Sequence, residues 1–303
     1  MLRTFEMFAG YGGSSFALKK AEIPFECVGY SEIKTHAIKC YEKNHCHTFP
    51  DMLKGQVIRP HNFGDCTKIN PNELPDFDLL TGGFPCTDVS TCGLRDLSKG
   101  RTILFSEIIR IAEVKKPKYM LLENVKGIKS KKDFFNFVCS EITRLGYNLQ
   151  ILELNSFDYG TPQNRTRIFF VCSLDKINLN LTKNPNTKEI SDFLDDDFDQ
   201  KYFLKKEHHY KLENKRYRFK NETDLSIPCL TAGHLKGWDD IRIKIGVDTY
   251  RYLKPIERFR FMGFFNDEID ISMLKESNAA DLAGNGWDIN LVSQIFKEMF
   301  KNE

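Results

Sequence analysis

The chain has 303 residues, of which 41% are hydrophobic and 28% are charged, and this composition excludes a disordered protein. No apolar run approaches the roughly 18 residues of a membrane-spanning helix, and the N-terminus lacks the pattern of a signal peptide. The 44 basic and 42 acidic residues nearly cancel, so any surface for a polyanion must be a local patch. We therefore expect a globular cytoplasmic protein of one or two domains, with no membrane partner.

The first 172 residues alternate short apolar runs with segments of helical spacing. Strands are expected at 4–8, 25–30, 77–80, 119–122, 149–154 and 168–172. Helices are expected at 14–21, 104–111 and 134–145, and Gly146 is a stop signal for the last of them. Strands that alternate with helices predict βαβ units, and therefore an α/β domain with a mostly parallel, Rossmann-like sheet.

The pattern changes after Ser173. Residues 174–200 are rich in Asn, Asp and Lys, and residues 201–220 are basic and aromatic. A strand is expected at 241–245, and helices at 255–264 and 291–300. We expect a smaller, irregular, β-rich domain over 174–278, with a hinge helix near 251–264, while 1–173 and 279–303 form the α/β domain.

A glycine-rich turn, Phe8-Ala9-Gly10-Tyr11-Gly12-Gly13, joins the first strand to the first helix. Glycines there let a ligand approach the backbone and the helix N-terminus. Glu32 ends the second strand 20 positions after Gly12 (32 − 12), the spacing at which a carboxylate meets ribose hydroxyls. Ser15 replaces the third glycine of a dinucleotide site, so S-adenosylmethionine fits better than NAD. The alternative is a turn that only tightens strand–helix packing.

A cysteine and a carboxylate end neighbouring strands of the predicted sheet. Cys86 follows Pro85 beyond the apolar run 77–80, and the polar residues 88–101 after it could close over a substrate. Glu123 and Asn124 end the next strand, and a thiol beside a carboxyl group makes covalent catalysis feasible. The alternative is an inert buried cysteine, which is the common role of a single thiol.

Nine cysteines, an odd number without a Cys-x-x-Cys pair, indicate reduced thiols. The cluster of Cys40, His45, Cys46 and His47 lacks the ligand spacing typical of zinc sites, so we expect no metal. Two arginines, Arg165 and Arg167, precede the strand at 168–172. Because they alternate along an extended segment, both are expected on one face, although paired arginines are also common on exposed strand edges.

In this order, the motifs resemble those of the cytosine-5 methyltransferases. The family pattern runs from a Phe-x-Gly-x-Gly turn through Pro-Cys, Glu-Asn-Val and Gln-x-Arg-x-Arg to a closing helix and Gly-Asn. The matching residues here are Phe8, Gly10, Gly12, Glu32, Asp65, Pro85, Cys86, Glu123, Asn124, Val125, Gln163, Arg165, Arg167, Arg251, Leu253, Glu257, Gly263, Phe264, Gly284 and Asn285. Thr87, Val89 and the pair Gly286-Trp287 depart from the usual residues, but none removes a reacting group, so we expect an active enzyme.

The resemblance implies a DNA cytosine-5 methyltransferase that uses S-adenosylmethionine and forms a covalent adduct between Cys86 and C6 of a flipped-out cytosine. The catalytic residues that it implies are Cys86, Glu123, Arg165, Arg167, Asn124 and Pro85. The residues that it implies for the cofactor site are Phe8, Ala9, Gly10, Tyr11, Gly12, Gly13, Glu32, Ile33, Asp65, Cys66, Pro85, Leu104, Asn285 and Gly286.

Double-stranded DNA is the partner that the resemblance implies, and the inserted region would recognise it. The candidate recognition residues combine cations with aromatic rings or lie in a glycine-bearing loop: His234, Lys236, Trp238, Lys215, Arg216 and Arg218. A solvated basic face is the alternative for residues 201–220. We expect a monomer, with a cognate restriction endonuclease as a candidate partner. In a bacterium the enzyme would lie at the nucleoid, and a nuclear location stays open for a eukaryote.

Two other functions stay open. The tRNA-methylating branch of the same family carries a Cys-Phe-Thr motif, to which Cys229-Leu230-Thr231 is close, although the Leu-Thr of the DNA enzymes explains these residues as well. A catalytically silent nucleic-acid-binding relative is the alternative from another class. The complete set of reacting residues argues against it, because a silent protein needs neither Cys86 nor Glu123.

Overall fold

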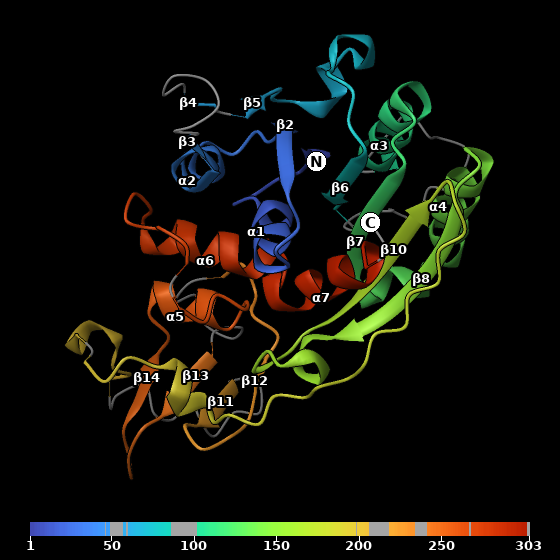
Figure 1. Ribbon diagram of the computed structural model, residues 1–303. Coiled ribbons are helices and arrows are strands. Elements are labelled where there is room, and N and C mark those ends of the chain that lie inside the picture. Colours follow the sequence, from blue (N-terminus) through green and yellow to red (C-terminus); the bar gives the residue numbers. More distant parts are fainter. Residues whose placement is uncertain are drawn as a thin grey trace. The chain divides into compact units, whose positions relative to one another are not determined.

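The computed structural model in Figure 1 describes residues 1–45, 47–48, 57–58, 60–85, 102–197, 199–205, 218–233, 241–266 and 268–301. The chain forms two compact units. The first contains Met1–Leu154, Thr166–Leu181 and Ser293–Glu303, and the second contains Asn155–Arg165 and Thr182–Val292. The domain limits that we expect from the sequence, 1–173 with 279–303 and 174–278, stay a prediction.

The first unit is built on a seven-stranded sheet with the strand order β5-β2-β1-β6-β7-β10-β8. The strands are β1 (Leu2–Met7), β2 (Phe25–Ser31), β5 (His61–Asn62), β6 (Leu79–Gly83), β7 (Tyr119–Val125), β8 (Asn148–Asn155) and β10 (Thr166–Ser173). The neighbours from β5 to β7 are parallel, and β10 runs antiparallel to β7. The predicted mostly parallel, Rossmann-like sheet is therefore confirmed. A further antiparallel pair is formed by β3 (His47–Thr48) and β4 (Val57–Ile58).

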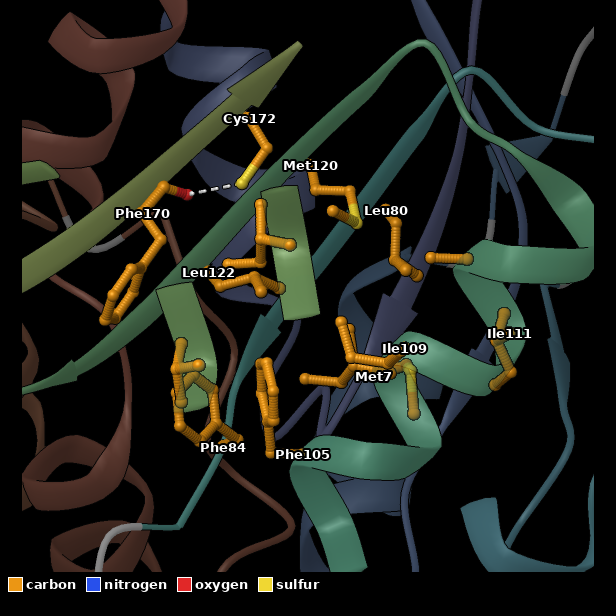
Figure 2. Close-up of a cluster of buried hydrophobic side chains, with 14 of the residues drawn as sticks. Met7, Leu80, Phe84, Phe105, Ile109, Ile111, Met120, Leu122, Phe170 and Cys172 are labelled. Carbon is orange, nitrogen blue, oxygen red and sulfur yellow. Dashed lines mark hydrogen bonds between the residues drawn. The ribbon is translucent and has the colours of Figure 1, made fainter. Parts of the chain in front are cut away.

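Helices cover both faces of this sheet. They are α1 (Gly13–Lys20), α2 (Thr35–His45), α3 (Thr102–Lys115), α4 (Lys132–Arg144) and α7 (Ile289–Met299), whose last residues belong to this unit. Because side chains alternate along a strand, Phe5 and Met7 of β1 enter the apolar core beneath α3 and α4. Figure 2 shows part of this core, with Ile109 on α3 and Met120 on β7.

The helix limits follow from the sequence signals. α4 ends where predicted, because Gly146 adopts the left-handed conformation (φ 89°) and its N–H donates to the Thr143 carbonyl. On the opposite face of the sheet, Glu6 of β1 bonds to Ser15 of α1 and Tyr41 of α2. Buried polar side chains therefore link α1 and α2 to the centre of the sheet.

The second unit is irregular and rich in short strands, as predicted. β11 (Arg218–Asn221) pairs parallel with β13 (Ile241–Lys244), which pairs antiparallel with β14 (Tyr250–Tyr252). β12 (Ile227–Pro228) pairs parallel with β9 (Gln163–Asn164). The helices of this unit are α5 (Pro255–Arg260), α6 (Glu276–Asn285) and the start of α7. Short 3-10 helices at Ser156–Tyr159, Ile190–Phe193 and Gln200–Tyr202 complete its described part.

A buried ion pair holds the end of β14 to α5. The Arg251 guanidinium donates both Nη atoms to the two Glu257 oxygens at 2.8 Å, and neither side chain is more than 1% exposed. Glu257 also accepts the backbone N–H of Lys254 at 2.7 Å and that of Asp195 at 2.8 Å. Asp195, the first residue of the acidic run Asp195-Asp196-Asp197, pairs with Lys254 and Arg260. This acidic run is therefore part of the scaffold of the second unit.

Across the described residues, none of the helices combines the length and apolarity that a bilayer crossing requires.

Candidate active site

The polar residues that we singled out in the first half of the chain follow strands of one parallel set. The glycine turn follows β1, Glu32 follows β2, and Asp65 comes shortly after β5. Pro85 comes just after β6, and Glu123 lies at the end of β7. Because these five strands are parallel, their carboxyl ends lie along one edge of the sheet. Strand order reverses between β1 and β6, where α/β proteins bind ligands outside the strand ends.

The glycine turn has the left-handed backbone that its sequence predicts. Gly10 and Gly12 have φ values of 58° and 84°, and Phe8 also lies in this region at 54°. An added Cβ at Gly10 would meet no atom within 4 Å, so the space over this residue is open to a ligand. Gly12 is different, because a Cβ there would lie 2.2 Å from His45 Nε2. One glycine leaves room on the turn and the other allows close packing.

Glu32 is tied to the turn. Its Oε2 accepts the Gly10 N–H at 2.9 Å, and its Oε1 accepts the N–H groups of Ile33 and Lys34. Each carboxylate oxygen has two lone pairs, so Oε2 can accept a further hydrogen bond from a hydroxyl group. Asn62, which the sequence analysis missed, holds the backbone of Glu32 from both sides. Its Oδ1 accepts the Glu32 N–H at 3.2 Å, and its Nδ2 donates to the Glu32 carbonyl at 3.1 Å.

Asp65 caps the short helix Cys66–Lys68. Its Oδ1 accepts the N–H and the hydroxyl of Thr67 at 3.0 and 2.8 Å. These hydrogen bonds favour the ionised form and lower the pKa of Asp65. Cys66 beside it is buried, and burial raises the pKa of its thiol to about 11. Asp65 can therefore offer a carboxylate, whereas Cys66 stays a neutral thiol.

The remaining predicted cofactor residues have different environments. Tyr11 is buried, Gly13 begins α1, and Ile33 is 69% exposed beside Glu32. Leu104 of α3 packs against the apolar core. Asn285 and Gly286 lie at the end of α6 in the second unit, where Asn285 Nδ2 donates to Asp281 Oδ1 at 2.8 Å. Their role toward a cofactor stays a prediction.

Glu123 and Arg167 form an ion pair at the end of β7. Arg167 Nε lies 2.8 Å from Glu123 Oε1, and the two side chains are only 13% and 11% exposed. The antiparallel register places Arg167 opposite Val125, so the two charged residues are diagonal neighbours on one face. The pairing of β6 with β7 aligns Gly83 with Glu123. The carboxylate therefore lies beside the strand end that leads to Pro85.

Asn124 fixes the backbone that leads to the predicted nucleophile. Its side chain is buried, and Nδ2 donates to the Phe84 carbonyl at 2.9 Å while Oδ1 accepts the Val125 N–H at 2.8 Å. Phe84 precedes Pro85 and Cys86 in the sequence. Cys86 itself and the loop 88–101 lie outside the described residues. Asn124 thus ties the end of β7 to the start of the Pro-Cys segment.

Arg165 differs from our expectation that it would share a face with Arg167. It lies between β9 and β10, where the extended alternation is interrupted. Its guanidinium is buried and donates to the Gly284 carbonyl at 3.2 Å and to the Gly286 carbonyl at 2.7 Å. The contacts of Arg165 are those of a residue that holds the backbone of the second unit.

Gln163 has a similar place in the second unit. Its Oε1 accepts the Leu230 N–H at 2.8 Å, and its Nε2 donates to the Phe261 carbonyl. Gly284 packs so closely that an added Cβ would lie 2.3 Å from the Ala232 nitrogen. The segment that ends in Thr231-Ala232-Gly233 is therefore held by Gln163 and by the close approach of α6.

The predicted nucleic-acid residues are largely outside the part of the chain that the structure describes. Lys215, Arg216, His234, Lys236 and Trp238 all fall in the undescribed segments. Arg218 begins β11, where its backbone pairs with that of Ile241. These six assignments stay predictions.

The sequence analysis also missed a buried carboxyl group beneath the turn. Glu6 is 2% exposed, and it accepts hydrogen bonds from Ser15 and from the Tyr41 hydroxyl, which lies 3.2 Å from Oε1. Burial raises the pKa of Glu6 to about 7, because its effect is larger than that of the hydrogen bonds, which lower the pKa. An acidic residue between the apolar Phe5 and Met7, two positions before Phe8, is the signal that could have identified it.

Comparison with known families supports the order of these motifs. The model of the C-5 cytosine-specific DNA methylases matches residues 2–244. The chain belongs to the C-5 cytosine-specific DNA methylase family. The predicted class of enzyme, a DNA cytosine-5 methyltransferase, is confirmed at this level. Within this methylase, the match includes the glycine turn, the Pro-Cys segment, Glu123 and both arginines.

Individual relatives agree with the family. The type II methyltransferase M2.ScrFI of Lactococcus lactis subsp. cremoris is 31% identical over 369 aligned positions that cover the whole of both chains. The type II methyltransferase M.HhaI of Haemophilus parahaemolyticus is 34% identical over 198 positions, 64% of this methylase and 56% of that chain. A solved Dnmt2 methyltransferase of S. pombe shares the fold, with a TM-score of 0.77 at 21% identity over 99% of both chains.

Proposed function

We propose that this methylase transfers a methyl group from S-adenosylmethionine to C5 of a cytosine that is flipped out of duplex DNA. The observation that carries the proposal is the ion pair of Glu123 and Arg167 at a strand end, beside the backbone that leads to Cys86. A pyrimidine must be activated before it can accept a methyl group. A thiol can add to the ring, and an acid and a cation can stabilise the charge that develops on it.

The cofactor would bind over the glycine turn. The open space at Gly10 and the carboxylates of Glu32 and Asp65 suit a nucleoside with ribose hydroxyls and an amino group. When bound there, S-adenosylmethionine supplies an electrophilic methyl group. Glu32 would accept hydrogen bonds from the ribose, because Asn62 and the Gly10 N–H hold its backbone and its carboxylate in place. Phe8, Ile33 and Leu104 would give apolar contact.

The cytosine ring is a poor nucleophile at C5 and needs covalent activation. Addition of the Cys86 thiolate to C6 would give an enamine whose C5 can attack the methyl group. Glu123 would hydrogen-bond N3 and the exocyclic amine and share the proton that stabilises the adduct. Arg167 would hold O2 and, through its 2.8 Å contact, orient the carboxylate of Glu123. After transfer, a base removes the C5 proton and the thiolate leaves.

Arg165 would act indirectly. Its donors are directed to backbone carbonyls of the second unit, so we assign it a positioning role and leave the contact with O2 to Arg167. Asn124 would likewise position the Pro85–Cys86 backbone through the Phe84 carbonyl. The second unit would hold the DNA, and a restriction endonuclease of the same specificity is a candidate partner, as for a type II enzyme.

The test is methyl transfer with labelled S-adenosylmethionine and two separate substrates, duplex DNA and tRNA. We expect label in DNA that is lost from the Cys86→Ser variant, while the variant still binds DNA within about threefold of the wild type. Label in tRNA alone would contradict the choice of substrate. DNA binding without any label would favour a catalytically silent relative. Sequencing of methylated cytosines in the product would then give the recognition sequence.

A further inference from the structure

His45 ends α2 and lies against the glycine turn of the first unit. It is 4% exposed, and its Nε2 lies 2.9 Å from the carbonyl oxygen of Tyr11. A carbonyl oxygen can only accept, so Nε2 is the protonated nitrogen of this ring. The contact joins residues 34 positions apart, in the helix after β2 and the turn after β1.

The same ring occupies the space above Gly12. An added Cβ at Gly12 would lie 2.2 Å from His45 Nε2 and 2.9 Å from Tyr41 Cε2. The ring is itself held by its neighbours, because its centroid lies 4.5 Å from that of Phe16 and 4.6 Å from that of Tyr41. Tyr41 in turn donates to Glu6. The position of the His45 ring is therefore fixed from α1, α2 and the centre of the sheet.

Side-chain contacts thus hold the turn on opposite sides of Tyr11. The Gly10 N–H donates to Glu32, and the Tyr11 carbonyl accepts from His45. Between them the backbone keeps the left-handed angles that open the space over Gly10. The Gly12 N–H, on the other side of the same peptide unit, donates to the Ala9 carbonyl at 2.8 Å, so the His45 contact restrains the peptide together with this backbone bond. Preorganisation of a binding loop lowers the cost of ordering it when the ligand binds.

We propose that His45 is a positioning residue for the cofactor turn: its Nε2–H holds the Tyr11 peptide, and its ring supports Gly12 in the binding conformation. The proposal rests on the proposed use of S-adenosylmethionine. It gives this histidine of the Cys40, His45, Cys46 and His47 cluster a role in cofactor affinity. The contacts of His45 with Tyr11, Phe16 and Tyr41 place it at the turn, so its effect should fall on cofactor binding rather than on the chemical step.

The experiment compares two substitutions of similar volume and flexibility, His45→Gln and His45→Met. Glutamine can return an amide donor to about the place of Nε2, whereas methionine cannot donate. We expect His45→Met to raise the Kd for S-adenosylmethionine about tenfold, or about 1.4 kcal/mol. His45→Gln should stay within about threefold of the wild type. At saturating cofactor, kcat should change less than twofold in both variants. Calorimetry on the full chain gives the Kd without need of DNA.

Tyr147→Phe is the matched control. Tyr147 is buried in the same unit, and its hydroxyl also donates to a backbone carbonyl, that of Pro117 at 2.7 Å. The control removes one such bond away from the turn, so it should lower stability but leave the cofactor Kd unchanged. Equal Kd values for His45→Met and His45→Gln would overturn the proposal, as would an equal shift in Tyr147→Phe. Failure of the wild type to bind S-adenosylmethionine would contradict the proposed function instead.

Gly12→Ala gives a second measurement if His45→Met does not fold. Its Cβ meets the ring directly, so Gly12→Ala should weaken cofactor binding more than tenfold. In the double variant with His45→Gln, the flexible side chain can move aside, and the combined loss should be smaller than the product of the two single losses. Independent effects would show that the ring does not support the turn, and would contradict the proposal.

Discussion

The two units of this methylase use polar side chains in opposite ways. In the first unit the core beneath α3 and α4 is apolar, and the charged residues Glu32, Asp65 and Glu123 stand at the carboxyl ends of strands. In the second unit, charged side chains are buried inside the fold, among them Arg165 and the pair of Arg251 and Glu257. Regular strands and helices satisfy their own backbone groups, whereas an irregular unit needs side chains to do so.

A charged residue in a motif is therefore not by itself a reacting residue. Arg165 and Arg167 are two positions apart in one motif. Arg167 pairs with a carboxylate at a strand end, and Arg165 donates to the carbonyls of Gly284 and Gly286 at the C-terminal end of α6. We assign Arg167 to the chemistry and Arg165 to support from the partner of each guanidinium, rather than from its place in the motif. Substitutions in the two units test this contrast.

The largest effect is expected at the strand end of the first unit. Glu123→Gln keeps the shape of the side chain but removes its ability to share a proton, so kcat should fall by about 10²–10⁴. DNA and cofactor affinities should change little. Steady-state kinetics with saturating substrates measure this loss. Glu141→Gln, on the surface of α4, is the control that should keep full activity. A fall in kcat of less than tenfold for Glu123→Gln would show that Glu123 does not share a proton in the chemical step.

The next largest effect is expected when the buried ion pair of the second unit is broken. Glu257→Ala leaves Arg251 buried without its carboxylate, and the free energy of unfolding should fall by about 3–5 kcal/mol. Lys129→Ala, which breaks a surface pair with Glu153, should cost less than about 1 kcal/mol. Denaturant unfolding followed by circular dichroism measures both. Similar losses for the two variants would mean that the buried pair contributes no more than an exposed one.

Glu6 is the exception inside the first unit, and its titration should be visible in stability. Burial raises the pKa of Glu6 from 4.5 to about 7, so the folded chain keeps a proton that the unfolded chain has already lost. The contribution of Glu6 is therefore complete below pH 4.5 and is lost as the pH rises through about 7, a loss on the order of 3 kcal/mol. Unfolding measured from pH 4 to 8 gives this slope, and Glu6→Gln should flatten it. The same slope in the variant would contradict the shifted pKa.

The smallest effect separates the two arginines of one motif. Arg165→Lys cannot reproduce the fork that reaches both Gly284 and Gly286, so the free energy of unfolding should fall by about 2 kcal/mol, with kcat at saturating substrates little changed. Arg167→Lys should show the reverse, a lower kcat with little change in stability. Paired kinetics and unfolding curves of the two variants measure this. A larger loss of kcat in Arg165→Lys than in Arg167→Lys would contradict the positioning role of Arg165 and indicate that it takes part in catalysis.

The sequence predicted the regular unit well, because strand and helix periodicity and the glycine signals are local. The limits of β2, α1 and α4 agree with the predicted ranges to within one or two residues. It could not predict contacts that depend on the fold, such as His45 with Tyr11 or Asn62 with Glu32. The acidic run that begins at Asp195 is a clear case. Asp195 pairs with Lys254 and Arg260, about 60 positions away, and local composition carries no signal for such contacts.

We propose that Cys86 attacks C6 of a cytosine that Glu123 and Arg167 activate. Duplex DNA with 5-fluorocytosine at the target position traps this adduct, because fluorine at C5 blocks the final loss of a proton. With S-adenosylmethionine present, we expect a denaturation-resistant complex whose cross-linked peptide contains Cys86, and no complex with Cys86→Ser. An enzyme that methylates ordinary DNA but forms no such complex would show that Cys86 does not attack C6.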